Sequence, residues 1–210
     1  MRRSPPPSQQ QSSDSERQIS EERLIRRLKN KAFHYLGRYS STEQRLYEVL
    51  QRFSRRKLEG VAPDRLEKAI RTVISQSVSL GYVNDRAFAE SQVRKGLQSG
   101  QSHAMIRARL KAAGITQSDA EAGFEAATDH LDRNRMELLS ALRFATRRRL
   151  GCFGQNRNGD IRASDPKLYE KQMAQLARRG FSYDIARQVL SLESPESAED
   201  LLNELESHLR

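Results

Sequence analysis

A short segment that ends one helix and begins the next occurs three times in this chain. It reads SLGYVND at residues 79–85, AAGITQSD at 112–119 and RRGFSYD at 178–184. Glycine takes the left-handed backbone conformation that ends many helices, because it has no Cβ to clash. An apolar residue follows each glycine, and a residue that favours helix N-termini comes soon after it. The three glycine corners consist of Gly81, Tyr82 and Asn84; of Gly114, Ile115 and Thr116; and of Gly180, Phe181 and Ser182.

The apolar residue of such a corner packs back onto the last helical turn, five positions earlier. This spacing places Leu110 under Ile115 and Leu176 under Phe181, whereas the first corner departs from it with Ser77 under its tyrosine. Three corners of one kind, two of them with the same spacing, favour a chain built from repeated helical units.

Helical patterns run from about Ser20 almost to the C-terminus, and no strand pattern competes with them. We expect an all-α protein of about nine helices in groups of three. One long helix is expected from Thr116 through Leu142, although Gly123 inside it costs roughly 1 kcal/mol relative to alanine unless a neighbour packs closely. Only 36% of the residues are hydrophobic, so we expect a core that is divided among the units.

Composition divides the chain into six segments. The first has no apolar residue beyond the initiator methionine and cannot form a core, the fourth is dense in helix breakers, and the last opens with a serine cap followed by proline. The segments are a disordered Pro/Ser/Gln-rich tail at 1–18, a first helical repeat with an extended connection at 19–80, a second helical repeat at 81–146, a Gly-rich loop at 147–164, a third helical repeat at 165–192 and an acidic C-terminal helix at 193–210.

The net charge of +10 is unevenly distributed. Residues 1–58 carry 14 Lys and Arg against six Asp and Glu, whereas residues 191–210 carry one against six. A basic body favours a polyanionic partner, either a nucleic acid or an acidic protein surface. The same composition also arises where arginine merely solvates exposed helices, and the acidic end is either an ordinary solvated helix or a shield for the basic body.

Side chains that carry catalysis or bind metals are sparse. The single cysteine, Cys152, excludes an internal disulfide and has no nucleophile motif around it. No apolar run is long enough for a membrane span, and the N-terminus does not read as a signal peptide. We therefore expect a cytoplasmic protein that is no enzyme and uses no cofactor or metal. The four histidines lack metal-ligand spacing and are His34, His103, His130 and His208.

Three stretches resemble the RecX family of bacterial regulatory proteins. They read GYVNDRAFAESQVR at 81–94, IRARLKAAGI at 106–115 and LARRGFSYDIARQVL at 176–190, and the resemblance covers roughly residues 32–190. The family's first motif has Asp where Asn84 stands and Arg-Phe where Ala87-Phe88 stands. The family often has Gly-Pro where Ser102-His103 stands, so the entry to the next helix differs.

The resemblance implies tandem three-helix repeats in an elongated, curved arrangement, with the corner joining the second and third helices of each repeat. It implies binding to the RecA nucleoprotein filament, reduced ATP turnover and strand exchange, and contact with single- or double-stranded DNA. We expect a monomer with no membrane partner. The candidate basic face for RecA or DNA consists of Arg94, Lys95, Arg107, Arg109, Lys111, Arg147, Arg148, Arg149, Arg178 and Arg179.

Two other functions remain open from the sequence. Three-helix units with basic helices also dock in nucleic-acid grooves, so a direct DNA-binding protein is one alternative. No helix combines arginine with Asn or Gln as a base-reading helix does. A helical adaptor for another protein is the second alternative.

Overall fold

The computed structural model describes residues 20–128, 131–154 and 166–207, and every regular element in these ranges is helical. The tail expected at residues 1–18 and most of the loop expected at 147–164 lie outside these ranges. Two compact units, Met1–Asn84 and Asp85–Arg210, make up the chain. The described ranges hold ten α-helices and one short 3₁₀ helix, which confirms the all-helical fold class with one helix more than the nine expected.

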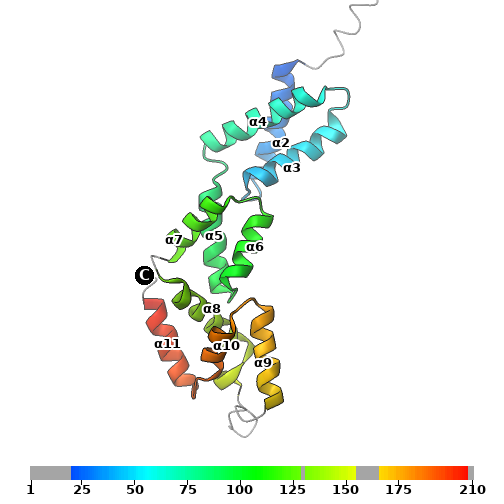
Figure 1. Cartoon of the computed structure of the whole chain (residues 1–210). Helices are drawn as coiled ribbons and strands as arrows, with labels where there is room; N and C mark the ends of the chain where they lie inside the picture. Colours follow the sequence, from blue (N-terminus) through cyan, green and yellow to red (C-terminus); the bar gives the residue numbers. More distant parts are fainter. Residues whose placement is uncertain (1–19, 129–130, 155–165, 208–210) are drawn as a thin grey trace, which may run out of the picture. The chain divides into compact units, whose positions relative to one another are not determined.

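The first unit is a group of three helices that pack on one another (Figure 1). Serine and threonine side chains cap the first two helices, because Ser20 Oγ accepts from Arg23 N and Thr42 Oγ1 accepts from Arg45 N. Proline occupies the first position of the third, where its missing N–H has no partner to lose. The helices are α2 (Glu21–Leu36), α3 (Glu43–Lys57) and α4 (Pro63–Ser79).

The second unit contains two further groups of three helices and a last helix. The first group packs α5 closely against α7, with α6 contacting both. In the second group α10 contacts both α8 and α9, and α11 packs along α8 (Figure 1). The elements are α5 (Asp85–Gln98), α6 (His103–Ala112), α7 (Gln117–Thr128), α8 (Arg133–Arg148), η1 (Gly151–Phe153), α9 (Pro166–Arg178), α10 (Tyr183–Leu190) and α11 (Pro195–Ser207).

The single long helix expected from residue 116 to 142 is wrong. The structure divides this stretch into α7 and α8, because Asp132 adopts an extended conformation and caps the second helix. Its Oδ1 accepts from Asn134 N at 2.9 Å and from Arg135 N at 3.0 Å. The apolar periodicity continues across this break and gives no sign of it. The local signal for the break is Asp132, a residue type that favours helix N-caps.

Three separate clusters of buried side chains confirm the divided core. One belongs to α2–α4 and is built on leucines such as Leu24, Leu28 and Leu50. A second joins α5, α6 and α7 around Ile106 and Phe124. The third joins α8, α9, α10 and α11. Each three-helix group therefore buries its own apolar faces, as tandem repeats do.

All three corner glycines have positive φ, at 74° for Gly81, 80° for Gly114 and 81° for Gly180. At each corner the N–H of the following residue donates to the carbonyl five positions earlier, at 2.9, 3.1 and 3.2 Å respectively. Ile115 and Phe181 are buried beneath their corners. These hydrogen bonds satisfy carbonyls that the helix end would otherwise leave unpaired.

The first corner differs from the other two in position and in packing. Gly114 joins α6 to α7 and Gly180 joins α9 to α10, the second and third helices of their groups, but Gly81 joins α4 to α5 and thus links two groups. Tyr82 is 57% exposed and packs edge-on against Phe33, while Val83 is buried instead. The first group has no glycine corner of this kind between its second and third helices, because α3 and α4 are joined by the longer connection around Gly60.

Substituting alanine at two of these glycines separates backbone strain from steric contact. Gly81→Ala meets no atom within 4 Å, so it should cost only the left-handed strain of roughly 1 kcal/mol. A Cβ at Gly180 would lie 2.6 Å from Ser102 Oγ, the cap of α6. Gly180→Ala should therefore cost roughly 2–3 kcal/mol, because a cap is worth about 1 kcal/mol more. Equal losses in chemical denaturation would contradict the contact between this corner and α6.

Candidate partner-binding surfaces

The ten candidate cations all lie in the second unit, and the structure separates them into two kinds. Five have side-chain contacts within that unit, and a sixth, Arg149, ends a helix through its backbone conformation. The other four have exposed side chains and form no ion pair or side-chain hydrogen bond with the described residues; these four are Lys95, Lys111, Arg148 and Arg178. We call these four the exposed cations.

Two of the structural arginines hold the corner between α5 and α6. Arg147 of α8 donates to the carbonyls of Gln98 and Ser99 at 2.7 and 3.2 Å, and so binds the carbonyl end of α5. A cation at a helix C-terminus also complements the helix dipole. Arg109 donates to Gln101 Oε1 at 2.9 Å in the same corner. These guanidinium groups stabilise the second unit and are only partly available to a partner.

Two other arginines are paired with glutamates on neighbouring turns and helices. Arg94 contacts Glu90 Oε1 at 3.0 Å and donates to the carbonyl of Ala126 at 2.9 Å, which ties α5 to α7. Arg107 lies 3.8 Å from Glu121 of α7, and its side chain is 40% exposed. Arg107 therefore keeps an exposed side chain but has the carboxylate of α7 within reach.

The last two structural arginines act at corners. Arg149 takes the left-handed conformation, with φ at 53°, and ends α8 as glycine does elsewhere. The guanidinium of Arg179 lies 4.9 Å from the ring centroid of Phe144, which is a cation–π contact. Arginine in the left-handed region is uncommon, and periodicity gives no signal for it.

The acidic helix α11 covers basic side chains of α8 that the sequence analysis did not single out. Arg135 pairs with Glu204 at 2.9 Å and Arg143 with Glu206 at 2.8 Å. Helix α11 also buries Leu205 in the third cluster, so it is an integral part of that core. Apolar packing and ion pairs therefore both hold α11 in place, so α11 is not merely a solvated helix.

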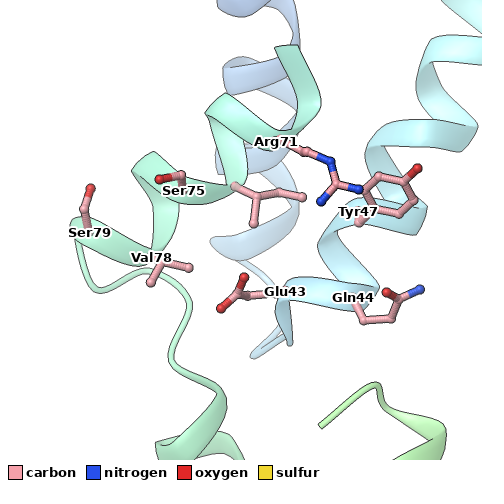
Figure 2. Close-up of a pocket in the computed structure, with 8 residues that line it drawn as sticks. Glu43, Gln44, Tyr47, Arg71, Ser75, Val78 and Ser79 are labelled. Carbon is pink, nitrogen blue, oxygen red and sulfur yellow. The ribbon is translucent and has the colours of Figure 1, made fainter. Parts of the chain in front are cut away.

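A pocket of about 530 Å³ lies between α3 and α4 in the first unit (Figure 2). Figure 2 shows Arg71 of α4 reaching toward Tyr47 of α3, with Glu43 at the start of α3 below them. Arg71 pairs with Glu67, and Tyr47 donates to the same carboxylate at 2.7 Å, a hydrogen bond that raises the pKa of the tyrosine. The charges of this wall therefore serve to join α3 to α4.

Two titratable groups, the buried His103 and the half-buried Glu137, connect α6 to α8. Glu137 Oε1 accepts from the backbone N–H of His103 at 2.9 Å, which caps the first turn of α6. Burial raises the pKa of Glu137. Burial, together with Arg133 and Arg107, lowers the pKa of His103 to about 4. The histidine ring also stacks on Phe124, with centroids 4.1 Å apart. This histidine thus belongs to the core.

His103 and Glu137 should affect the pH dependence of the stability of the fold in opposite directions. A histidine with a depressed folded pKa stabilises the fold above about pH 6.5, and this contribution is lost as the pH falls toward 4. Glu137 acts in the other direction, because its raised pKa destabilises the fold as the pH rises above its unfolded value. Replacing Glu137 with Gln removes that opposition and keeps an oxygen that can cap α6.

In the Glu137→Gln protein we expect the free energy of unfolding to fall by about 1–2 kcal/mol between pH 7 and pH 5 through His103. Adding His103→Gln should flatten this dependence. Denaturant titrations at pH 5, 6 and 7 measure both. Identical pH slopes with and without the histidine would contradict its burial in the neutral form.

Other chemistry finds little support in the described ranges. They contain no group of three or more His, Cys, Asp and Glu side chains placed to hold a metal ion. The Cys152 thiol is 1% exposed, and burial raises its pKa, so it is a poor nucleophile. None of the described helices combines the length and apolar character that crossing a membrane requires.

Comparison with known proteins gives consistent matches. A family model described as "RecX, third three-helix domain" matches residues 153–190. The protein named Regulatory protein RecX from Agrobacterium fabrum is 28% identical over 182 residues, which cover 87% of this chain and 91% of that protein. A protein of the same name from Vibrio campbellii is 26% identical over 79% of this chain and 90% of its own length. No solved structure gives a significant match.

A further protein with this name, from Myxococcus xanthus, is 30% identical over 165 residues. The match covers 78% of this chain and 83% of that protein. The described fold agrees with it, because the family model is named for a three-helix domain and the chain forms three-helix groups. This chain therefore belongs to the RecX family of regulatory proteins.

Proposed function

We propose that this chain regulates a RecA recombinase, mainly as an inhibitor, by binding the RecA nucleoprotein filament and lowering its ATP turnover and strand exchange. The observation that carries the proposal is the match to proteins named Regulatory protein RecX over most of both chains. The basic character of the chain supports it, because a nucleoprotein filament presents phosphates and acidic protein surfaces. The tandem helix groups support it as well, because stacked repeats offer extended binding surfaces.

Co-sedimentation with RecA tests the binding part of this proposal. RecA filaments assembled on single-stranded DNA with a non-hydrolysable ATP analogue should bring the chain into the pellet. RecA without DNA, and the same DNA without RecA, should bring down much less. Equal recovery with DNA alone would favour the direct DNA-binding alternative. Recovery with neither would favour an adaptor for a different protein.

The exposed cations should contribute to filament binding as a group. Reversing Lys95, Lys111 and Arg178 to Glu should weaken co-sedimentation at least tenfold, because several exposed charges act together on a polyanionic surface. The loss should be largest at low salt, since screening already weakens such contacts near physiological ionic strength. The matched control reverses the charge of three solvent-exposed side chains of the first unit, Arg23, Arg26 and Lys68.

Helix content and thermal stability of both triple variants should equal those of the unmodified chain, because no replaced side chain is paired with a described residue. A control variant that loses as much binding as the test variant would show that only total charge matters. In that case the exposed cations of the second unit are not the filament contact.

A further inference from the structure

We propose that a groove between α2 and α3 binds single-stranded polynucleotide, with arginine and lysine side chains on the phosphates and aromatic rings against the bases. The groove has a volume of about 440 Å³. Its lining residues, which we call the α2/α3 groove, are Lys31, Tyr35, Val49, Arg52, Phe53, Arg56 and Lys57. None of them belongs to the basic face that the sequence analysis put forward.

Helical spacing aligns these residues along the groove. Lys31 and Tyr35 are four positions apart on α2, and Arg52 and Arg56 are four apart on α3. Such residues occupy one face of a helix and follow one another at about 6 Å. The guanidinium of Arg27 donates to the carbonyl of Lys57 at 3.1 Å, which holds the middle of α2 against the end of α3. The cations therefore line a fixed track.

The positive charge of the groove is not neutralised within the described part of the chain. None of its four cations forms an ion pair there, whereas seven arginines elsewhere in the described ranges do. Arg52 is four positions after Glu48, yet its Nε donates to the backbone carbonyl of Glu48. Residues 51–57 contain four cations and no carboxylate. Uncompensated cations aligned in a groove favour a polyanionic ligand.

Aromatic rings beside the cations favour a nucleic acid over an acidic peptide. Tyr35 and Phe53 are half-buried in the lining, so part of each ring faces the groove. Tyr39 is 58% exposed, and its ring centroid lies 5.4 Å from that of Tyr35, which extends the aromatic surface outward. Rings interleaved with cations are the arrangement that binds single strands, because each base has a face to stack. The base faces of a duplex are already stacked on one another, so they are not available to these rings.

The inference goes beyond the proposed regulation of RecA, because it concerns a site that acts without any recombinase. It also makes the groove separate from the exposed cations, which lie in the other unit. Failure of one proposal therefore leaves the other standing. Binding of a labelled oligothymidylate to the full-length chain, followed by fluorescence anisotropy, measures this interaction without RecA, and variants then assign it to the groove.

The first arm of the experiment reverses charge. Arg52→Glu with Arg56→Glu should weaken oligothymidylate binding at least tenfold and lower the salt slope by about 1.4, from two lost phosphate contacts. Arg23→Glu with Arg26→Glu changes the net charge equally on the exposed surface of α2 and should weaken binding less than threefold. Equal losses in the two double variants would overturn the proposal. Circular dichroism checks that both remain folded.

The second arm tests the rings. Phe53→Leu keeps an apolar side chain in the lining and should weaken oligothymidylate binding five- to tenfold, since a stacked base is worth about 1–3 kcal/mol. Its binding to an abasic oligomer of the same length should be unchanged. An equal loss on both oligomers would overturn the stacking role. Oligoglutamate that competes as well as oligothymidylate would overturn the assignment to nucleic acid in favour of an acidic peptide.

Discussion

A chain that ends at Leu192 should lose most of the stability of the third helix group. Helix α11 buries Ala198 and Leu205 and packs Leu201 and Leu202 against the third cluster. Exposing these side chains costs roughly 4–6 kcal/mol at about 1.5–3 kcal/mol for each fully buried leucine. This is comparable with the whole stability of an ordinary domain. Thermal unfolding should show an early transition that the complete chain lacks.

A matched charge variant separates packing from electrostatics in α11. Glu204→Gln with Glu206→Gln removes the partners of Arg135 and Arg143 but leaves the leucines in place. These ion pairs are partly exposed, so the double variant should lose no more than about 1 kcal/mol. An unfolding profile of the truncated chain that matches the charge variant would contradict the role of α11 in the core.

The same charge variant tests whether the acidic helix shields the basic body. Truncation cannot test this, because it also removes part of a core. Neutralising the two glutamates removes two negative charges beside Arg135 and Arg143. We expect binding to DNA to become about two- to fourfold tighter at low salt, with little change at high salt. Unchanged affinity at low salt would show that α11 has a packing role alone.

Gly123→Ala should destabilise the chain by roughly 3 kcal/mol, although alanine is the better helix former by about 1 kcal/mol. A Cβ at Gly123 would lie 2.7 Å from the Ala89 Cβ and 2.9 Å from the backbone nitrogen of Glu90. Backbone atoms of α5 cannot move aside as a flexible side chain does. The substitution should therefore force α5 and α7 apart and disturb the second cluster.

The control for this substitution lies on the exposed side of the same helix. Ala126→Gly should cost up to about 1 kcal/mol, since it changes helix propensity without changing a helix contact. Chemical denaturation of both variants measures the difference. A stabilising effect of Gly123→Ala would mean that propensity outweighs packing here and that α5 and α7 are farther apart than the structure places them.

Local signals in the sequence predicted much of the fold. The left-handed glycines could be predicted because a glycine, an apolar residue and a cap have to occur in that order at such a corner. Asp132 was missed because apolar periodicity crosses it, and Arg149 was missed because nothing in its local sequence marks a left-handed arginine. Gly123 was noted as a cost, but the α5 backbone that explains it comes from 34 residues earlier in the chain.

The binding surfaces were harder to predict, because the availability of a cation depends on residues distant in sequence. Arg147 meets the carbonyls of Gln98 and Ser99, and Arg107 meets Glu121, and neither contact leaves a periodic pattern. The α2/α3 groove was missed for a related reason. Each helix contributes only a few of its cations, and these line one groove only when the two helices pack against each other.

The most direct test of the regulatory role is the rate of ATP hydrolysis by RecA on single-stranded DNA. Purified full-length chain is added in substoichiometric amounts, and ATP turnover is followed at low and physiological salt, with the Lys95, Lys111 and Arg178 reversal variant as the comparison. We expect a clear fall in ATP turnover with the unmodified chain and a much weaker one with the variant. An unchanged rate at a chain concentration equal to that of RecA would contradict the proposed regulatory role.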